Sequence, residues 1–251
     1  MATGPALLSS PERAAREASI ELLVTWQDPV TRRYHPVGVL ARTLEGTYRF
    51  RYLEGARRVT SFLPFLGFSA LDRDYTSPHL FPLFAERVLD ESRPDRVTLF
   101  EALDLVDTAG PMEFLARSGG RRAGDTIEMV PVPTVDGVDT TCVFLVHGVR
   151  YLEGASEALE SLTPGQALRL EPEPENEHDP LAVLVSTDEA RLGWVPNPLL
   201  DYVRAVMGAG AATLTVVRAN PPELGHHMRL LVRIEGRLPA GYQLPWRATR
   251  D

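Results

Sequence analysis

The chain has 251 residues; its 26 basic residues are all arginine, and 34 acidic residues give a formal net charge of −8. Because it has no lysine, the composition excludes Walker-type phosphate loops, protein kinases that depend on a strand lysine, and Schiff-base enzymes. The negative charge argues against sequence-blind wrapping of a nucleic-acid backbone, which needs many cationic contacts. Any nucleic-acid role must therefore depend on a local site.

Cysteine content and the terminal sequence bear on the compartment. Cys142 is the single cysteine, which excludes an intramolecular disulfide and any zinc site with two or more thiolates. Residues 1–10 have neither a basic start nor a long apolar run, and apolar runs elsewhere are only about as long as one strand. We therefore expect a cytoplasmic protein that does not span a membrane and holds no cofactor or metal ion.

The N-terminal half predicts a small sheet with short helices. Residues 1–18 indicate a flexible tail. Segments rich in Val, Tyr, Phe and Leu predict a three-stranded antiparallel meander at residues 20–26, 36–42 and 47–53. A proline-punctuated loop over residues 62–78 follows, and apolar spacing predicts helices at residues 79–89, 96–105 and 112–116. After a glycine turn, residues 125–130 predict another strand.

The C-terminal half predicts a small β-barrel after a linker. Proline and glycine are frequent in residues 131–139, so we place the domain boundary there. Strand-like segments follow at residues 141–149, 167–171, 181–186, 191–195, 212–218 and 228–234. Helices are expected at residues 155–161 and 198–207. Six short strands in this space indicate a closed or nearly closed barrel, because closure removes unpaired edges.

These elements define an α+β protein with two domains. The first, residues 19–133, is expected to be an antiparallel sheet with short helices. The second, residues 140–236, is expected to be a small OB-like β-barrel with two helices. Residues 237–251 are expected to form an irregular tail.

Three motifs in the second half resemble the HIRAN domain, a DNA-binding module. They are residues 147–151 (HGVRY), 173–183 (EPENEHDPLAV) and 192–196 (LGWVP), in the order and spacing of that family. The resemblance implies an OB-like barrel that holds a single-stranded DNA end. It also implies capture of the terminal nucleotide and its free 3′-hydroxyl in a pocket.

Carried over by position, the resemblance implies the DNA-binding residues Arg150, Tyr151, Leu152, Asn176, His178, Asp179 and Trp194. Arg150 would pair with a phosphate and Tyr151 would stack on a base, since a guanidinium fork suits phosphate and an aromatic face suits any base. Asn176 and Asp179 would form a polar floor, with Asp179 accepting a hydrogen bond from the sugar hydroxyl. Trp194 would supply a second stacking surface.

Two of these positions depart from the family pattern, and other interpretations stay open. Leu152 stands where members often have another aromatic residue, and His178 replaces a common tyrosine. Asn176 and Asp179 can equally cap turns by bonding their own backbone. The alternating acids of residues 171–179 add negative charge beside the proposed phosphate site; such acids are more often solvated than metal-binding, so we expect no metal.

The first half resembles the N-terminal subdomain of HipA-type toxin kinases. The resemblance is carried by residues 37–40 (VGVL), 48–52 (YRFRY), 81–89 (FPLFAERVL) and 112–116 (MEFLA), before the glycine turn at 118–120. The HIRAN-like half begins where the kinase domain of that family would start. We therefore expect this half to bind a protein partner, either a kinase or a DNA-processing enzyme, rather than to phosphorylate it.

The sequence thus predicts a nucleic-acid-binding protein that is not an enzyme and works on single-stranded DNA ends in DNA repair or defence. HIRAN domains often precede zinc-binding RING domains and ATPases that hydrolyse acid anhydrides, but no residues here support either activity. The alternative is a protein-interaction module that restrains a HipA-like kinase without binding DNA.

Overall fold

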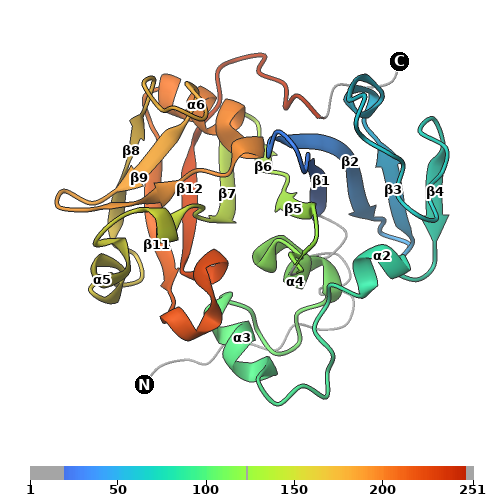
Figure 1. Ribbon diagram of the computed structural model, residues 1–251, viewed down its shortest axis with the longest axis horizontal. Helices are drawn as coiled ribbons and strands as arrows, with labels where there is room; N and C mark the ends of the chain where they lie inside the picture. Colours follow the sequence, from blue (N-terminus) through green and yellow to red (C-terminus); the bar gives the residue numbers. More distant parts are fainter. Residues whose placement is uncertain (1–19, 123, 247–251) are drawn as a thin grey trace. The chain divides into compact units, whose positions relative to one another are not determined.

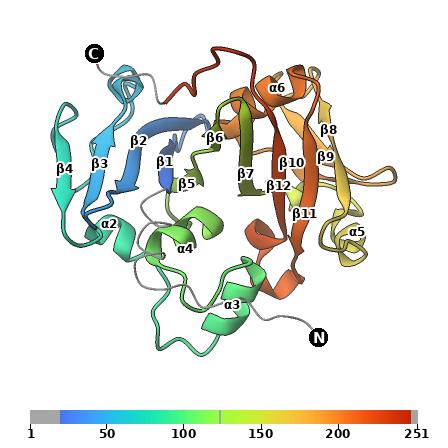
Figure 2. The same ribbon diagram turned by 180° about the vertical axis from the view of Figure 1, so that it is seen from behind.

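The computed structural model describes residues 20–122 and 124–246, which form two compact units divided between Val132 and Pro133 (Figures 1 and 2). Each unit is built on one antiparallel sheet. Within the described residues, no helix combines the length and apolar character that a membrane crossing requires. The predicted tail at residues 1–18, and residues 247–251 of the predicted C-terminal tail, lie outside the described residues.

The sheet of the first unit has the strand order β4-β3-β2-β1-β5 (Figure 1). Its strands are β1 (Glu21–Gln27), β2 (Tyr34–Arg42), β3 (Tyr48–Tyr52), β4 (Asp74–Ser77) and β5 (Ile127–Pro131). In β3 the buried rings of Tyr48, Phe50 and Tyr52 alternate with Arg49 and Arg51, because successive side chains of a strand point to opposite faces. The predicted meander, and the strand predicted near residues 125–130, are confirmed.

Phe50 lies in the core of the first unit and is fully buried. The rings of Tyr52, Phe68 and Phe84 lie 4.9, 4.7 and 5.4 Å from its ring, centroid to centroid. Such tilted and edge-on pairs add to the stabilisation that comes from burial. The hydroxyl of Tyr52 accepts a 2.7 Å hydrogen bond from the backbone N–H of Phe65, and burial raises the pKa of Tyr52 to about 12. The loop that carries Phe65 and Phe68 is thereby held on the sheet.

The prediction of an uninterrupted loop over residues 62–78 is wrong at its end, where Asp74–Ser77 form β4. Tyr75 pairs with Phe50 in the strand register, and its ring lies 5.0 Å from that of Phe68. Its hydroxyl also accepts a hydrogen bond from the backbone N–H of Ala70. Packing of the tyrosine against the core therefore outweighs the turn signal of the neighbouring proline.

The helices of the first unit are α2 (Pro82–Ala85), α3 (Arg96–Ala102) and α4 (Pro111–Ser118), and a 3-10 turn, η1 (Glu54–Arg58), follows β3. The helix predicted at residues 79–89 is wrong in length, since α2 is a single turn. Beyond it, the N–H of Val88 bonds to the carbonyl oxygen only three residues back, so the α-helical pattern ends. α3 stops before residue 105 because Asp104 adopts a positive φ of 54°.

The sheet of the second unit has the strand order β10-β9-β8-β11-β12-β7-β6. Its strands are β6 (Thr134–Asp136), β7 (Asp139–Leu145), β8 (Ala167–Pro172), β9 (Val183–Ser186), β10 (Arg191–Trp194), β11 (Thr213–Ala219) and β12 (Leu230–Arg237). The two helices are α5 (Ala155–Glu160) and α6 (Leu200–Gly208). The six predicted strands and both predicted helices are confirmed, whereas β6 forms within the segment predicted as a linker because it pairs with β7.

Short 3-10 turns connect several of these strands: η2 (Val149–Tyr151), η3 (Asn197–Leu199), η4 (Pro222–Leu224) and η5 (His226–Met228). The predicted closed barrel is not confirmed, because the strand ladders form an open sheet. One isolated bridge, between His147 and Trp194, joins β10 at one end of this sheet to the segment after β7. Residues 238–246 contain no helix or strand, yet Leu238, Leu244 and Trp246 are buried.

Replacement of Gly38 by alanine tests the packing around Phe50. A Cβ atom at this position would lie 2.5 Å from the Phe50 ring. We expect Gly38→Ala to lower the free energy of unfolding by about 1–3 kcal/mol, because overpacking a tight core forces side chains and backbone to shift. Gly55→Ala is the matched control, since its Cβ would meet nothing within 4 Å. Equal urea-unfolding midpoints for the two variants would contradict the prediction.

Candidate nucleic-acid interface

A pair of backbone hydrogen bonds brings the first and third motifs of the second unit together. The N–H of His147 donates to the carbonyl oxygen of Trp194 at 2.9 Å, and the N–H of Trp194 donates to that of His147 at 2.8 Å. Such reciprocal bonding is the antiparallel pattern. The chain leaving β7 is therefore fixed beside the end of β10, which carries the indole of Trp194.

Two glycines allow this close approach. Gly148 adopts a φ of +77°, and a Cβ there would lie 2.5 Å from the Trp194 ring. Gly193, with a φ of +148°, would place a Cβ 2.4 Å from the carbonyl oxygen of His147. Residues with a side chain rarely adopt either backbone conformation. The indole of Trp194 therefore packs on the backbone that opens directly into η2.

Arg150 and Tyr151 form a stacked pair within η2. The guanidinium carbon of Arg150 lies 4.6 Å from the centroid of the Tyr151 ring, and a guanidinium nitrogen donates a hydrogen bond to the tyrosine hydroxyl. Both residues are exposed, and Tyr151 keeps 70% of its surface accessible. Tyr151 is therefore not packed into the core of the unit. A cation and an aromatic ring are presented together to solvent.

Asn176 and Asp179 close the turn between β8 and β9. The Oδ1 atom of Asn176 accepts hydrogen bonds from the backbone N–H groups of His178 and Asp179 at 3.0 and 3.1 Å. Asp179 accepts one bond from the backbone N–H of Leu181 at 2.9 Å and one from the side-chain amide of Asn197 at 2.7 Å. Asn176 and Asp179 therefore cap the turn by bonding to its backbone, which was the alternative to a role in DNA binding. The sugar contact predicted for Asp179 stays a prediction.

Glu173 links this turn to Trp194, a role that the sequence reasoning missed. Its Oε2 atom accepts hydrogen bonds from Asn176 Nδ2 at 2.7 Å and from Trp194 Nε1 at 2.8 Å, and its Oε1 atom pairs with Arg191. This carboxylate is thus neutralised by an arginine rather than adding free negative charge. The spacing of Glu173 three residues before Asn176 is the sequence signal that could have indicated a turn-stabilising pair.

The seven predicted residues differ in how closely they are tied together. Glu173 connects Asn176 with Trp194, and Trp194 packs on the glycine before η2. Asp179 is bonded to η3 through Asn197. Leu152 follows η2 in extended conformation and is half-buried, and His178 is exposed on the turn, where only its backbone N–H is held by Asn176.

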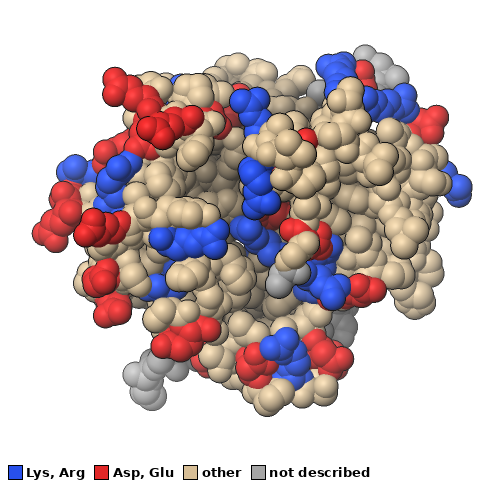
Figure 3. Space-filling view, viewed as in Figure 1, with Lys and Arg blue, Asp and Glu red and all other residues tan. Residues whose placement is uncertain are grey.

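Acidic side chains border this region. Figure 3 shows them gathered over the part of the visible face where β8, β9 and α5 lie. The exposed acids there belong to α5 and to the strands and turns around β8 and β9, namely Glu157, Glu160, Glu171, Glu175, Glu177, Asp188 and Glu189. Among the described residues, no three His, Cys, Asp or Glu side chains are grouped as metal ligands would be. This acidic side repels a phosphate backbone.

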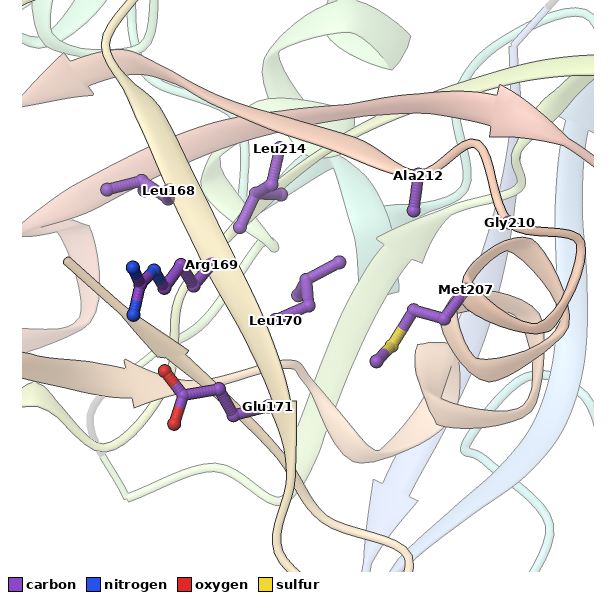
Figure 4. A pocket seen from close by; sticks show the side chains of 8 residues that line it. All are labelled: Leu168, Arg169, Leu170, Glu171, Met207, Gly210, Ala212 and Leu214. Carbon is purple, nitrogen blue, oxygen red and sulfur yellow. The ribbon is translucent and has the colours of Figure 1, made fainter. Parts of the chain in front are cut away.

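A cavity of about 530 Å³ opens elsewhere in the second unit, where β8 separates from β11 (Figure 4). Leu168, Leu170, Met207 and Leu214 contribute its apolar surface. Its charged rim is already satisfied, because Arg169 pairs with Asp188 and a side-chain oxygen of Glu171 accepts a hydrogen bond from Ser186. None of the seven predicted residues lines this cavity. The cavity therefore offers a phosphate no unpaired cation, whereas Arg150 is exposed and forms no ion pair with a described carboxylate.

The HIRAN domain family model matches residues 140–238, which confirms the prediction of a HIRAN domain in the C-terminal half. A solved protein from Lactobacillus plantarum is similar, with 22% identity over 40% of this chain and 99% of that chain and a TM-score of 0.33. The HIRAN domain of human HLTF is similar with 16% identity over 42% of this chain and 84% of that chain, and a TM-score of 0.30. No curated protein matches the chain. The HipA-like character of the first half stays a prediction.

Removal of the Glu173 carboxylate tests its role in holding the turn on Trp194. In Glu173→Ala, Asn176 Nδ2 and Trp194 Nε1 lose their acceptor. We expect faster amide exchange over residues 176–181 and a loss of about 1–3 kcal/mol in unfolding free energy, the cost of leaving polar groups unpaired. Hydrogen-exchange mass spectrometry and urea unfolding measure the two effects. Glu177→Ala removes an exposed carboxylate from the same turn; if the two variants exchange alike, Glu173 has no special role.

Proposed function

We propose that residues 140–238 bind the end of single-stranded DNA through Arg150, Tyr151 and Trp194. The observation that carries the proposal is the exposed Arg150–Tyr151 stack, which follows directly on the glycine that packs against Trp194. An arginine fork pairs with a phosphate oxygen, and an aromatic ring stacks on any base. Together they grip a nucleotide without reading its sequence.

Recognition of an end is assigned to Asp179. Each of its carboxylate oxygens accepts one hydrogen bond and retains further acceptor capacity. A free 3′-hydroxyl can donate to such an oxygen, whereas a 3′-phosphate would bring two further negative charges to the same carboxylate. In this proposal, a strand with a free 3′-hydroxyl therefore binds more tightly than one that ends in phosphate.

The acidic surroundings limit how much of the strand is held. Because carboxylates border α5, β8 and β9, nucleotides that lie farther from η2 on this side meet negative charge. This supports a binding module that captures one terminus, with no catalytic step of its own, and that serves a cytoplasmic repair or defence protein as its end-recognition part.

Titration of labelled oligonucleotides tests end capture. Short single strands with a free 3′-hydroxyl should bind more tightly than the same strands with a 3′-phosphate. Tyr151→Ala should weaken binding by about 1–3 kcal/mol, the usual value of one base–aromatic stack. Arg150→Ala should reduce the slope of log K against log salt by about 0.7, the value for one phosphate contact on a single strand. Fluorescence anisotropy measures both quantities.

A matched control removes a similar pair from the other unit. The guanidinium of Arg73 lies 5.5 Å from the centroid of the Tyr75 ring in the first unit, so Arg73→Ala disrupts an arginine–tyrosine stack without touching η2. This variant should bind as the wild type does. Two results together would contradict end capture. The wild type would bind strands with a 3′-hydroxyl and a 3′-phosphate with equal affinity, and the Arg150 and Tyr151 variants would bind as tightly as the Arg73 variant.

For the first unit we propose protein contact, favoured by two exposed leucines on a loop that is otherwise anchored in the core. Leu63 and Leu66 keep 79% and 97% of their surface accessible, while Phe62 and Phe65 beside them are buried. The buried rings of Phe62 and Phe65 anchor the loop on the core. The two leucines are therefore held in exposed positions by an ordered loop. Apolar side chains exposed in this way are typical of a contact surface.

Co-purification from the source cells tests this contact and its partner. Wild-type protein should retain a HipA-like kinase, and Leu63→Ser/Leu66→Ser should lose it, because the substitutions remove apolar contact area without changing the core. Mass spectrometry identifies what is retained. Recovery of DNA-processing enzymes in place of a kinase would contradict restraint of a kinase, and equal recovery by both proteins would contradict the role of the leucines.

A further inference from the structure

Arg229 is a buried arginine at the base of the loop between β11 and β12. Only 1% of its surface is exposed. Its Nε–H donates to the carbonyl oxygen of Asn220 at 2.8 Å, one terminal nitrogen donates to Ser156 Oγ at 2.8 Å, and the other donates to the carbonyl oxygen of Ser156 at 3.2 Å. The guanidinium thus joins the β11–β12 loop to the first turn of α5.

All three acceptors of this guanidinium are electrically neutral. Within residues 20–122 and 124–246, no carboxylate forms an ion pair with Arg229. An arginine side chain stays protonated in proteins, so a full positive charge is buried here with hydrogen bonds and, among the described residues, without a carboxylate paired to it. An apolar side chain of similar volume would avoid the desolvation cost, which means that stability alone does not account for an arginine at this position.

The position of this charge relates it to η2. Arg229 directly follows η5, and η5 packs against η2. Ser156, which the guanidinium grips twice, lies five residues after Tyr151, and α5 also packs against η2. Arg229 therefore links η5 to α5, and both of these elements pack against η2.

We propose that Arg229 is a positioning residue for the Arg150–Tyr151 pair and that its unpaired charge adds to the attraction for a DNA phosphate at η2. The inference rests on the proposed function of that pair. A buried charge is screened by salt less than an exposed one, so its contribution persists where surface charges have lost theirs. In a unit bordered by carboxylates, it supplies positive potential without a side chain that could pair with an acid at the surface.

The test compares three variants in strand binding and in amide exchange. Arg229→Met removes both the charge and the brace, Ser156→Ala removes one acceptor and keeps the charge, and Arg237→Met removes an exposed charge from the far end of β12. We expect Arg229→Met to weaken binding by about twofold to sixteenfold, the range for one unit charge acting over roughly 10 Å at effective dielectric constants between about 80 and 20. Ser156→Ala should weaken binding less, and Arg237→Met should bind as the wild type does.

Two readouts separate positioning from a general loss of stability. Exchange over residues 149–156 should accelerate in Arg229→Met and Ser156→Ala while β7 stays protected. In the background of Arg150→Ala/Tyr151→Ala, Arg229→Met should have a smaller effect on binding than in the wild type, because the positioning role has no pair left to act on and residues that act through one another are not additive. If Arg229→Met does not fold, Arg229→Lys replaces it: that variant keeps the charge and loses the fork, so it should bind more weakly with an unchanged salt dependence.

The outcomes distinguish this inference from the function on which it rests. If the wild type binds no single strand, the proposed function fails and this inference fails with it. If the wild type binds strands through Arg150 and Tyr151, but Arg229→Met matches Arg237→Met, only the inference on Arg229 is overturned. It is also overturned if the effect of Arg229→Met is undiminished when Arg150 and Tyr151 are absent.

Discussion

The paired backbone hydrogen bonds between His147 and Trp194 are the constraint on which the candidate interface depends. β10 is at one end of the seven-stranded sheet and β7 lies near the other, so the strand ladders alone do not bring the motifs together. The bridge does so, and the two glycines beside it remove the side chains that would block it. Glu173 then ties the turn of the middle motif to the same indole. Three separated stretches of sequence thereby share one small surface.

The charge distribution limits the length of nucleic acid that the candidate interface could bind. An acidic protein whose cations are all guanidinium groups cannot rely on diffuse attraction to a polyanion, and much of its arginine is already committed to ion pairs such as Arg191 with Glu173. The second unit instead holds Arg150 exposed on the Tyr151 ring, and Arg229 is buried with no carboxylate of the described residues paired to it. With much of the arginine already paired, the proposed interface is better suited to selecting a strand terminus than to binding a long strand tightly.

The sequence predicted what is encoded locally. Alternation in β3 and the turn residues around it were sufficient to predict the meander, and the motif resemblance singled out Arg150, Tyr151 and Trp194, whose role in binding stays a prediction. What depends on distant partners was missed. β4 exists because Tyr75 packs on the aromatic core, and β6 exists because it pairs with β7. Trp194, one partner of Glu173, lies 21 residues away in the sequence, and Ser156, one partner of Arg229, lies 73 residues away, so neither of these two links is visible in local spacing.

The short contact between β8 and β11 has a mechanical consequence. β8 pairs with β11 at Ala167 and Leu168, and Gly165 and Gln166 just before β8 add backbone hydrogen bonds to Val216. On the other side, the bridge between His147 and Trp194 joins β10 to the segment after β7. The three strands β8, β9 and β10 are thus joined to the rest of the second unit's backbone through two short contacts. One of these contacts, between His147 and Trp194, lies in the candidate interface. A ligand bound there would stabilise the closed arrangement of these three strands. Their local opening would in turn release the ligand.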